Sequence, residues 1–86
     1  MKYQVVVPKP VQKQLDKLKG DDRDRSLKAI LGLKTNPRPR GCVKLKRYDN
    51  EYRIRAGNYR IRYEVDDHNG IVLLLHLKHR KDAYKT

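Results

Sequence analysis

The stretch that decides the fold is YRIRAGNYRIRYEV, residues 52–65, in which apolar and basic side chains alternate on both sides of Gly57-Asn58. Alternation of this kind is typical of β-strands with one buried face, and this dipeptide forms two-residue turns in β-hairpins. A two-residue turn sets apolar positions of one strand against apolar positions of the other. The expected pairs are Ala56 with Tyr59, Arg55 with Arg60, Ile54 with Ile61, Arg53 with Arg62, and Tyr52 with Tyr63. The sequence therefore predicts a hairpin with four arginines on one face.

These four arginines do not serve the stability of the hairpin. Like charges that face each other across two strands cost about a few tenths of a kcal/mol per pair, and only Glu51 and Glu64 lie near enough to offset them. One guanidinium group can bind two oxygens of a phosphate at once, and it keeps its charge at any working pH. The pattern indicates a phosphate-binding surface; a sheet face made soluble by its charge is the alternative interpretation.

Two further segments carry strand patterns. Apolar and polar positions alternate through residues 1–7, and the prolines that follow end this extended stretch. Alternation resumes at Gly41 and runs toward the hairpin. Residues 71–77 begin with five consecutive aliphatic side chains, which is typical of a central strand covered on both faces.

Two short helices are expected between the first strand and the hairpin. The first has Pro10 in its opening turn and ends near Gly20. The second is expected to begin with Asp21 or Asp22 as its cap and to stop at the proline-bearing residues 36–39. Apolar residues recur at helical spacing in both, namely Val11, Leu15, Leu18, Leu27, Ile30 and Leu31.

Together these patterns predict an α+β fold. The expected order is an N-terminal strand, a two-helix hairpin and a three-stranded antiparallel meander, with the helices packed on one face of the sheet. A chain of 86 residues has material for one small core, so residues 1–86 are expected to form a single domain.

Charge is the dominant feature of the composition. The chain has 22 lysines and arginines against 10 aspartates and glutamates, a formal charge of +12, and an isoelectric point near 10.1. Such an excess is typical of proteins that bind polyanions. It is concentrated in residues 38–62, whereas the helices carry several aspartates. The charge therefore favours the sheet, rather than a helix in a DNA groove, as the binding element.

Several classes of protein are disfavoured. No apolar run approaches the roughly 20 residues of a membrane span, and the N-terminus lacks the apolar core of a secretory signal. Cys42 is the single cysteine, which favours a reducing cytoplasm and no membrane partner. No zinc-type spacing, phosphate loop or catalytic carboxylate pair is present, so no metal or cofactor is expected.

Three histidines supply the side chains whose ordinary pKa lies near neutrality. His68 falls in an expected turn at residues 66–70 and is expected to be solvated. His76 fits either the edge of the core or the basic face. His79, which precedes Arg80, is the candidate for catalysis, with a structural role as the alternative.

The hairpin at residues 52–65, followed by HRKDAY at residues 79–84, resembles the RelE family of bacterial toxins. The order of a strand, two helices, a proline-bearing turn, Leu45-Lys46 and the hairpin is also that of the family, so the resemblance spans essentially the whole chain. It implies the microbial-ribonuclease-like RelE fold and cleavage of messenger RNA in the ribosomal A site. Members of the family cleave without a metal, by attack of the RNA 2′-hydroxyl on the adjacent phosphate.

The family's site residues carry over by motif to Arg53, Arg55, Arg60, Arg80 and Tyr84. On this hypothesis Arg60 stabilises the charge on the phosphorane and Arg80 lies near the leaving 5′-oxygen. Arg53 and Arg55 hold the RNA backbone, and Tyr84 stacks on or orients a base. Other basic residues expected to bind RNA are Lys44, Lys46, Arg47, Arg62, Lys78 and Lys81.

One departure from the family concerns the general base. Relatives with the clearest mechanism carry lysines where this chain has Arg53 and Arg55, and a guanidinium gives up a proton far less readily than an ammonium. His79 is the available substitute in the sequence. A pH optimum set by one group near neutrality would support that role.

The resemblance also implies partners in a bacterial or archaeal cytoplasm. They are a cognate RelB-like antitoxin, the ribosome with its mRNA, and operator DNA only indirectly through the antitoxin. An antitoxin segment that covers the arginines would block RNA binding. Two other uses of the same fold stay open, a ParE-like poison of DNA gyrase and a catalytically silent toxin that acts by binding only. Lysines on the helices that could contact ribosomal RNA are Lys13, Lys17, Lys19, Lys28 and Lys34.

Overall fold

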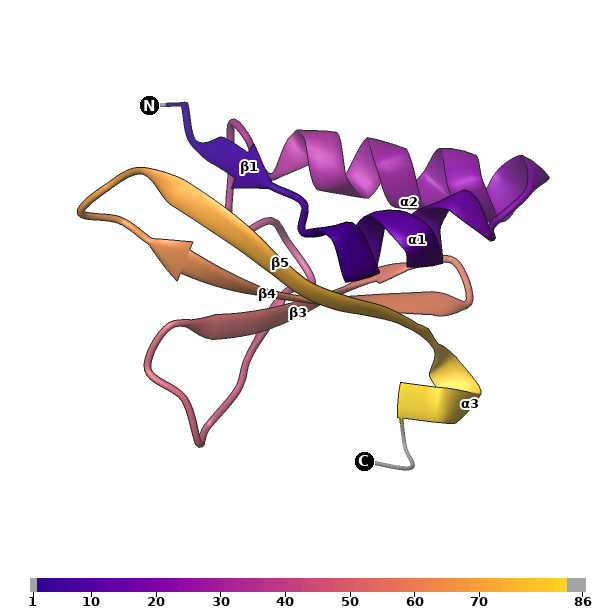
Figure 1. Ribbon diagram of the computed structural model, residues 1–86. Coiled ribbons are helices and arrows are strands. Elements are labelled where there is room, and N and C mark those ends of the chain that lie inside the picture. The colour runs from indigo at the N-terminus through magenta and orange to yellow at the C-terminus, as the bar shows by residue number, and fades with distance from the viewer. Residues whose placement is uncertain (1, 84–86) are drawn as a thin grey trace.

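The structure, a computed structural model, describes residues 2–83 and places two helices over one face of a five-stranded sheet (Figure 1). The elements in chain order are β1 (Gln4–Val6), α1 (Lys9–Asp16), α2 (Gly20–Gly32), β2 (Val43–Lys44), β3 (Glu51–Ala56), β4 (Tyr59–Asp66), β5 (Ile71–His79) and α3 (Arg80–Ala83). The predicted α+β class is confirmed.

The sheet is larger and more mixed than the predicted meander. Its strand order is β1-β5-β4-β3-β2. The meander of β3, β4 and β5 forms the centre, β2 adds an antiparallel edge strand beside β3, and β1 pairs in parallel with β5. The first strand of the chain thus pairs with the last strand, and local sequence patterns do not specify this pairing.

The hairpin has the register that the alternation predicts. Its opposed pairs are Ala56 with Tyr59, Arg55 with Arg60, Ile54 with Ile61, Arg53 with Arg62, and Tyr52 with Tyr63. Gly57 has a φ of +63°, and every residue with a positive φ within residues 2–83 is a glycine. A positive φ at the first turn position alone is the geometry of a type II′ turn, whose twist matches the flanking strands.

The two helices pack their apolar stripes on the sheet, α1 against β5 and α2 against β3 and β4. Pro10 lies in the first turn of α1 as expected, but that helix already ends at Asp16. The expected aspartate cap of α2 is wrong, because Lys19 holds the cap position without a side-chain hydrogen bond. Asp21 and Asp22 lie instead in the first turn, where carboxylates interact favourably with the helix dipole.

The core lies between the helices and the sheet. It consists of Val11, Leu15, Leu18, Ile30, Leu33, Tyr52, Ile54, Ala56, Ile61, Tyr63, Val65, Val72, Leu74 and Leu77. Every apolar position of the hairpin contributes to this core or packs against it, so the opposite face of the hairpin is left to the arginines.

A bulge in β5 changes which side chains share a face. Arg62 pairs with His76 and Tyr63 pairs with Leu74, so Leu75 is an extra residue in β5. An inserted residue shifts the alternation of a strand by one position. Leu74 and Leu77 are therefore both buried, at 0% and 4% exposure, although they are three residues apart.

An ion-paired cluster ties the ends of several elements together. The Arg38 guanidinium donates to both carboxylate oxygens of Asp67, at 3.1 and 2.7 Å, and its Nε donates to the Tyr52 hydroxyl at 2.9 Å. The Tyr3 hydroxyl donates to the same carboxylate at 2.7 Å. The cluster joins the start of β1, the loop after α2, β3 and the turn between β4 and β5.

No helix within residues 2–83 is long and apolar enough to cross a membrane.

Candidate functional site

The face of the sheet opposite α1 and α2, here called the arginine face, gathers basic side chains from three strands. Residues opposite each other in a ladder share a face, so the register places the members in two rows. One row runs from Arg53 on β3 through Arg62 on β4 to His76 on β5. The second row contains Arg55, Arg60 and Lys78. Neighbouring strands lie about 4.8 Å apart, so each row spans about 10 Å across the three strands.

The arginines differ in burial. Arg60 on the central strand is buried, at 4% exposure, whereas Arg55 on β3 is exposed. Burying a guanidinium costs desolvation energy. The fold therefore holds one cation at the centre of this face and a long, exposed cation at its edge, which is a suitable arrangement for gripping an anion that approaches from solvent.

Arg62 is held by two neighbours. Its guanidinium forms a salt bridge with Glu51 at 3.1 Å, and its Cζ lies 4.7 Å from the centre of the Tyr48 ring. Burial opposes the charge on Arg62, but the interactions with Tyr48 and Glu51 outweigh it and raise the pKa of the guanidinium. Tyr48 is itself 48% exposed. It offers a solvent-accessible aromatic surface beside a fixed cation.

A groove beside this pair brings together three of the basic residues expected to bind RNA. It has a volume of about 460 Å³ and is lined by Leu45, Lys46, Arg47, Tyr48 and Arg62. Aromatic rings next to cations are the usual surface for single-stranded nucleic acid, where a stacked base contributes about 1–3 kcal/mol. No role for Tyr48 was predicted from the sequence. The signal that could have identified it is its position directly after the basic run at residues 44–47.

The remaining predicted residues lie at different places. Lys44 on β2 pairs with Tyr52 and so belongs to the face that carries the helices. Arg80 and Lys81 begin α3 and are exposed, and the Arg80 N–H donates to the Asn58 carbonyl at 2.8 Å. This bond holds Arg80 beside the hairpin turn, at the end of the arginine face formed by Arg55 and its row. Tyr84 lies outside the described residues.

His79 does not join the arginine face. It pairs with Tyr59, the ring centroids are 5.2 Å apart in an edge-to-face arrangement, and Tyr59 packs against the core. Its Nδ1 accepts a hydrogen bond from the Lys81 N–H at 3.2 Å, so it caps the start of α3. His79 precedes Arg80 in the sequence, but it lies on the opposite face of the sheet from Arg60.

His76 is the histidine that the structure brings to the arginines. Burial, Lys78 and Arg62 lower the pKa of its imidazole, and Glu51 opposes them. The run of aliphatic residues before it hides the bulge, so alternation alone left two possible faces for this side chain.

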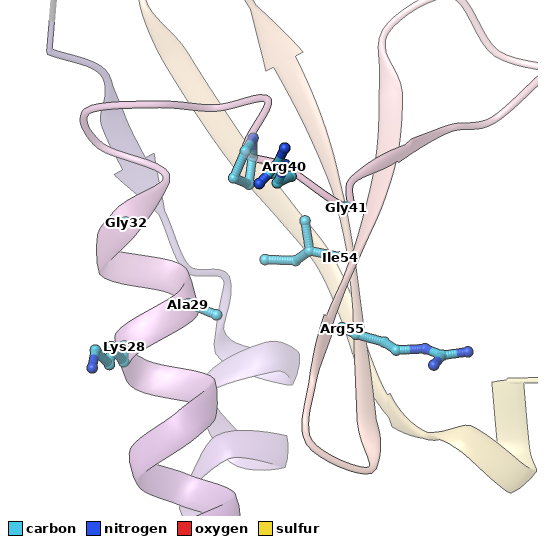
Figure 2. A pocket seen from close by; sticks show the side chains of 8 residues that line it. Lys28, Ala29, Gly32, Arg40, Gly41, Ile54 and Arg55 are labelled. Carbon is cyan, nitrogen blue, oxygen red and sulfur yellow. The ribbon is translucent and has the colours of Figure 1, made fainter.

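A separate pocket lies on the other side of β3 (Figure 2). It has a volume of about 300 Å³, and its floor is made by Ala29 of α2 and Ile54 of β3. Figure 2 shows Ile54 pointing toward α2 while Arg55 points to the opposite side of the strand. The pocket lies mainly on the side of β3 that faces α2, and Arg55 of the arginine face borders it. Within residues 2–83, no group of three or more His, Cys, Asp or Glu side chains is arranged to hold a metal ion.

A family model described as the ParE toxin of the type II toxin–antitoxin system parDE matches residues 5–84. A protein of Methanocaldococcus jannaschii named as the toxin RelE1 is 34% identical over 89 residues, and the alignment covers 100% of this chain and 99% of that protein. This chain belongs to the RelE/ParE superfamily of toxins. The match spans the helices as well as the hairpin, so it does not depend on the arginine motif alone.

Solved structures of RelE proteins share the fold. A chain in the archaeal RelE–RelB complex from Pyrococcus horikoshii OT3 has a TM-score of 0.83 and 33% identity, covering 93% of this chain and 97% of that one. A chain in the antitoxin–toxin complex of Methanococcus jannaschii has a TM-score of 0.73 and 29% identity, covering 94% of each. A mutant E. coli toxin RelE in the free state has a TM-score of 0.79, covers 98% of this chain and 90% of that one, and at 23% identity shows the fold alone.

Proposed function

We propose that this toxin is a metal-independent endoribonuclease that cleaves mRNA in the ribosomal A site and so inhibits translation. The observation that carries the proposal is the pair of basic rows across β3, β4 and β5, which present Arg53, Arg55, Arg60 and Arg62 on one face. Relatives of the RelE type, at 33% and 34% identity over nearly the whole chain, support the same family of activity.

The chemistry requires charge and proton control rather than a protein nucleophile. The RNA 2′-oxygen attacks the adjacent phosphorus, a cyclic phosphate forms, and the 5′-oxygen leaves. Arg60, at the centre of the arginine face, is assigned to the phosphorane charge. Arg80 is assigned to the leaving oxygen because its backbone is fixed at the hairpin turn. Arg53 and Arg55 hold the flanking phosphates.

Binding of the message extends beyond the reacting phosphate. Lys46, Arg47 and Arg62 border the groove beside Tyr48, where a base of single-stranded RNA can stack. Lys78 lies in the row of Arg60, and Lys81 on α3 flanks it. Tyr84 is assigned to a base at the cleavage site, and Lys44 at the sheet edge to the RNA further along.

The proposed partner for inhibition is a RelB-like antitoxin. Solved relatives include RelE–RelB complexes from Pyrococcus horikoshii and Methanococcus jannaschii. An acidic or amphipathic segment of the antitoxin that covers the arginine face would exclude RNA, since both ligands would need the same charges. Contact with operator DNA is assigned to the antitoxin. Antitoxin and RNA are therefore expected to compete; a saturated antitoxin complex that still cleaves RNA would contradict this.

The experiment that tests the activity is primer-extension mapping of a defined message in a purified translation system, with and without ribosomes. The wild type is compared with Arg80→Ala and with Arg40→Ala, a matched control because Arg40 is exposed and lies in the loop between α2 and β2 rather than in the arginine rows. We expect cuts within the A-site codon only on ribosomes, absent with Arg80→Ala and kept with Arg40→Ala. Folded wild-type protein that binds its antitoxin but makes no cuts would sink the proposal.

The description of the family model as a ParE toxin supports a second candidate function. In that case the protein would poison DNA gyrase. The basic face would then bind an acidic or nucleic-acid surface without cleaving it. A supercoiling assay separates the two functions: inhibition of purified gyrase by the wild type, together with intact mRNA on ribosomes, would favour the ParE-like function. RNA cuts with unimpaired gyrase would remove it.

A further inference from the structure

Among the described residues, the arginine face contains one histidine, the side chain whose ordinary pKa lies near neutrality. Of the three histidines, His68 lies in the exposed turn between β4 and β5 and His79 lies on the face that carries the helices. His76 is the histidine whose ladder partner, Arg62, belongs to the arginine face. Guanidinium groups cannot act as bases at neutral pH. Beside His76 and the arginines, this face carries Lys78 and the carboxylates Glu51 and Glu64, of which Glu51 is bound to Arg62.

The bulge in β5 is the device that puts His76 there. Without the extra Leu75, a regular alternation from Leu74 would place residue 76 in the core, and Leu77 on the arginine face. Bulges of this kind frequently lie beside active sites, where they redirect a single side chain. The fold thus breaks its ladder at one position, and the residue that changes face is a histidine.

The surroundings of His76 fit a group that acts as a base. Its Nδ1 is buried and finds no hydrogen-bond partner among residues 2–83, and we assign contact with a ligand to the other ring nitrogen, Nε2. The charged groups around it are Lys78 on its own strand, Arg62 on β4 and Glu51 on β3. Burial and the two cations lower the pKa of the imidazole and so favour its neutral form, which is the form that accepts a proton.

We propose that His76 is the general base of RNA cleavage, an inference that rests on the endoribonuclease function proposed above. A phosphate bound over Arg60 and Arg62 on the central strand lies one strand spacing, about 4.8 Å, from the row position of His76. In the step, Nε2 of His76 takes the proton of the 2′-hydroxyl. The bond from the 2′-oxygen to phosphorus forms, the bond from phosphorus to the 5′-oxygen breaks, and that oxygen takes a proton from water. His76 then releases its proton to solvent.

Substrate binding should also tune this base. The RNA phosphate offsets the charges of Arg62 and Lys78, which are the cations that disfavour the imidazolium form. The pKa of His76 is therefore expected to be higher in the RNA complex than in the free protein. In kinetic terms, the acid limb of kcat should lie at higher pH than the acid limb of kcat/KM.

The test is the pH profile of single-turnover cleavage on programmed ribosomes for the wild type, His76→Gln, His79→Gln and His68→Gln. We expect His76→Gln to slow cleavage by about 100-fold or more and to abolish the acid limb. His68→Gln is the control and should keep both the rate and the profile. Removal of the acid limb by His79→Gln while His76→Gln retains it would overturn the proposal in favour of the histidine that caps α3.

Two measurements separate a base from a structural residue. Affinity for a short RNA with a 2′-deoxy group at the cleavage site should be the same for wild type and His76→Gln, because the base is not needed for binding. The NMR titration of the His76 ring should give a pKa that matches the acid limb of kcat/KM. Weaker binding by His76→Gln, or a ring pKa unrelated to that limb, would overturn the assignment. Absence of cleavage by the wild type would remove the endoribonuclease function and this role with it, whereas a cleaving wild type with an unaffected His76→Gln would remove this role alone.

Discussion

At the scale of single residues, Asp67 shows how one exposed carboxylate serves several elements. It accepts hydrogen bonds from the Arg38 guanidinium and from the Tyr3 hydroxyl. Both interactions favour the charged carboxylate, with Arg38 the larger, and they lower the pKa of Asp67. The same carboxylate raises the pKa of Tyr3, chiefly because the hydroxyl proton is held in the hydrogen bond to Asp67.

The lowered pKa gives stability a defined dependence on pH. An aspartate whose pKa is lower when folded than when unfolded, where it is about 3.9, contributes stability above that value and loses it as the pH falls through the folded pKa. We expect Asp67→Asn to be less stable than wild type at neutral pH, with the gap closing below about pH 4. Thermal unfolding midpoints measured across this range test it.

The control for this prediction is a double-mutant cycle with Arg38→Met. If Asp67 acts through Arg38, Asp67→Asn should have a smaller effect in the Arg38→Met background than in the wild type. An equal effect in both backgrounds, or a gap that stays constant down to low pH, would show that the ion pair is not the source of the stability.

At the scale of elements, the hairpin was predictable in full because its constraints are local. Alternation assigned each side chain of residues 52–65 to a face, and a two-residue turn left one register that keeps apolar residues together. The parallel pairing of β1 with β5 was not predictable, because the two strands are more than sixty positions apart and neither carries a local signal for the other. The role of β2 is similar, since only Val43 and Lys44 pair.

The candidate site was predictable only where it depends on local patterns. The arginines of the hairpin follow from its register, whereas the faces of the histidines depend on the bulge at Leu75, which a run of five aliphatic residues conceals. His79 pairs with Tyr59 across the ladder for this reason, and His76 moves to the arginines. The roles of these residues stay predictions.

The turn of the hairpin offers a prediction about stability. Gly57 adopts a φ of +63°, and a Cβ built there would lie 3.3 Å from the Arg25 side chain. Because a non-glycine residue in this conformation costs about 1–2 kcal/mol, we expect Gly57→Ala to reduce the free energy of unfolding by about that amount. Urea unfolding followed by circular dichroism measures it.

The matched control is Gly32→Ala in α2. A Cβ at Gly32 meets nothing within 4 Å, and its φ is not positive. Because alanine favours the helix over glycine by up to about 1 kcal/mol, this variant should be as stable as the wild type or more so. Equal destabilisation of the two variants would show that the turn conformation is not what Gly57 supplies.

At the scale of the whole molecule, the two faces of the sheet have different roles. The helices cover one face and seal the core, and the other face carries the arginine rows. The fold measures 34 × 25 × 25 Å, with α1 and α2 packed on the face of the sheet opposite the arginine rows. Lys28 lines a pocket with Arg55, and Lys17 lines one with Lys78. Lys13, Lys19 and Lys34 are exposed on or beside the helices, and we expect these three to contact a large polyanion such as the ribosome.

This division predicts two separable dependences on salt. In a complex with single-stranded RNA, each phosphate that a cation neutralises adds about 0.7 to the slope of log affinity against log salt. For a short RNA with a 2′-deoxy cleavage site, we expect Arg62→Gln to reduce the slope by about that amount. Joint substitution of Lys13, Lys19 and Lys34 by Gln should leave that slope unchanged but reduce the slope for ribosome binding. Fluorescence anisotropy between about 50 and 200 mM KCl gives both slopes. If the helix substitutions weaken binding of the short RNA as much as Arg62→Gln does, the affinity depends on the net charge of the whole molecule rather than on the arginine face.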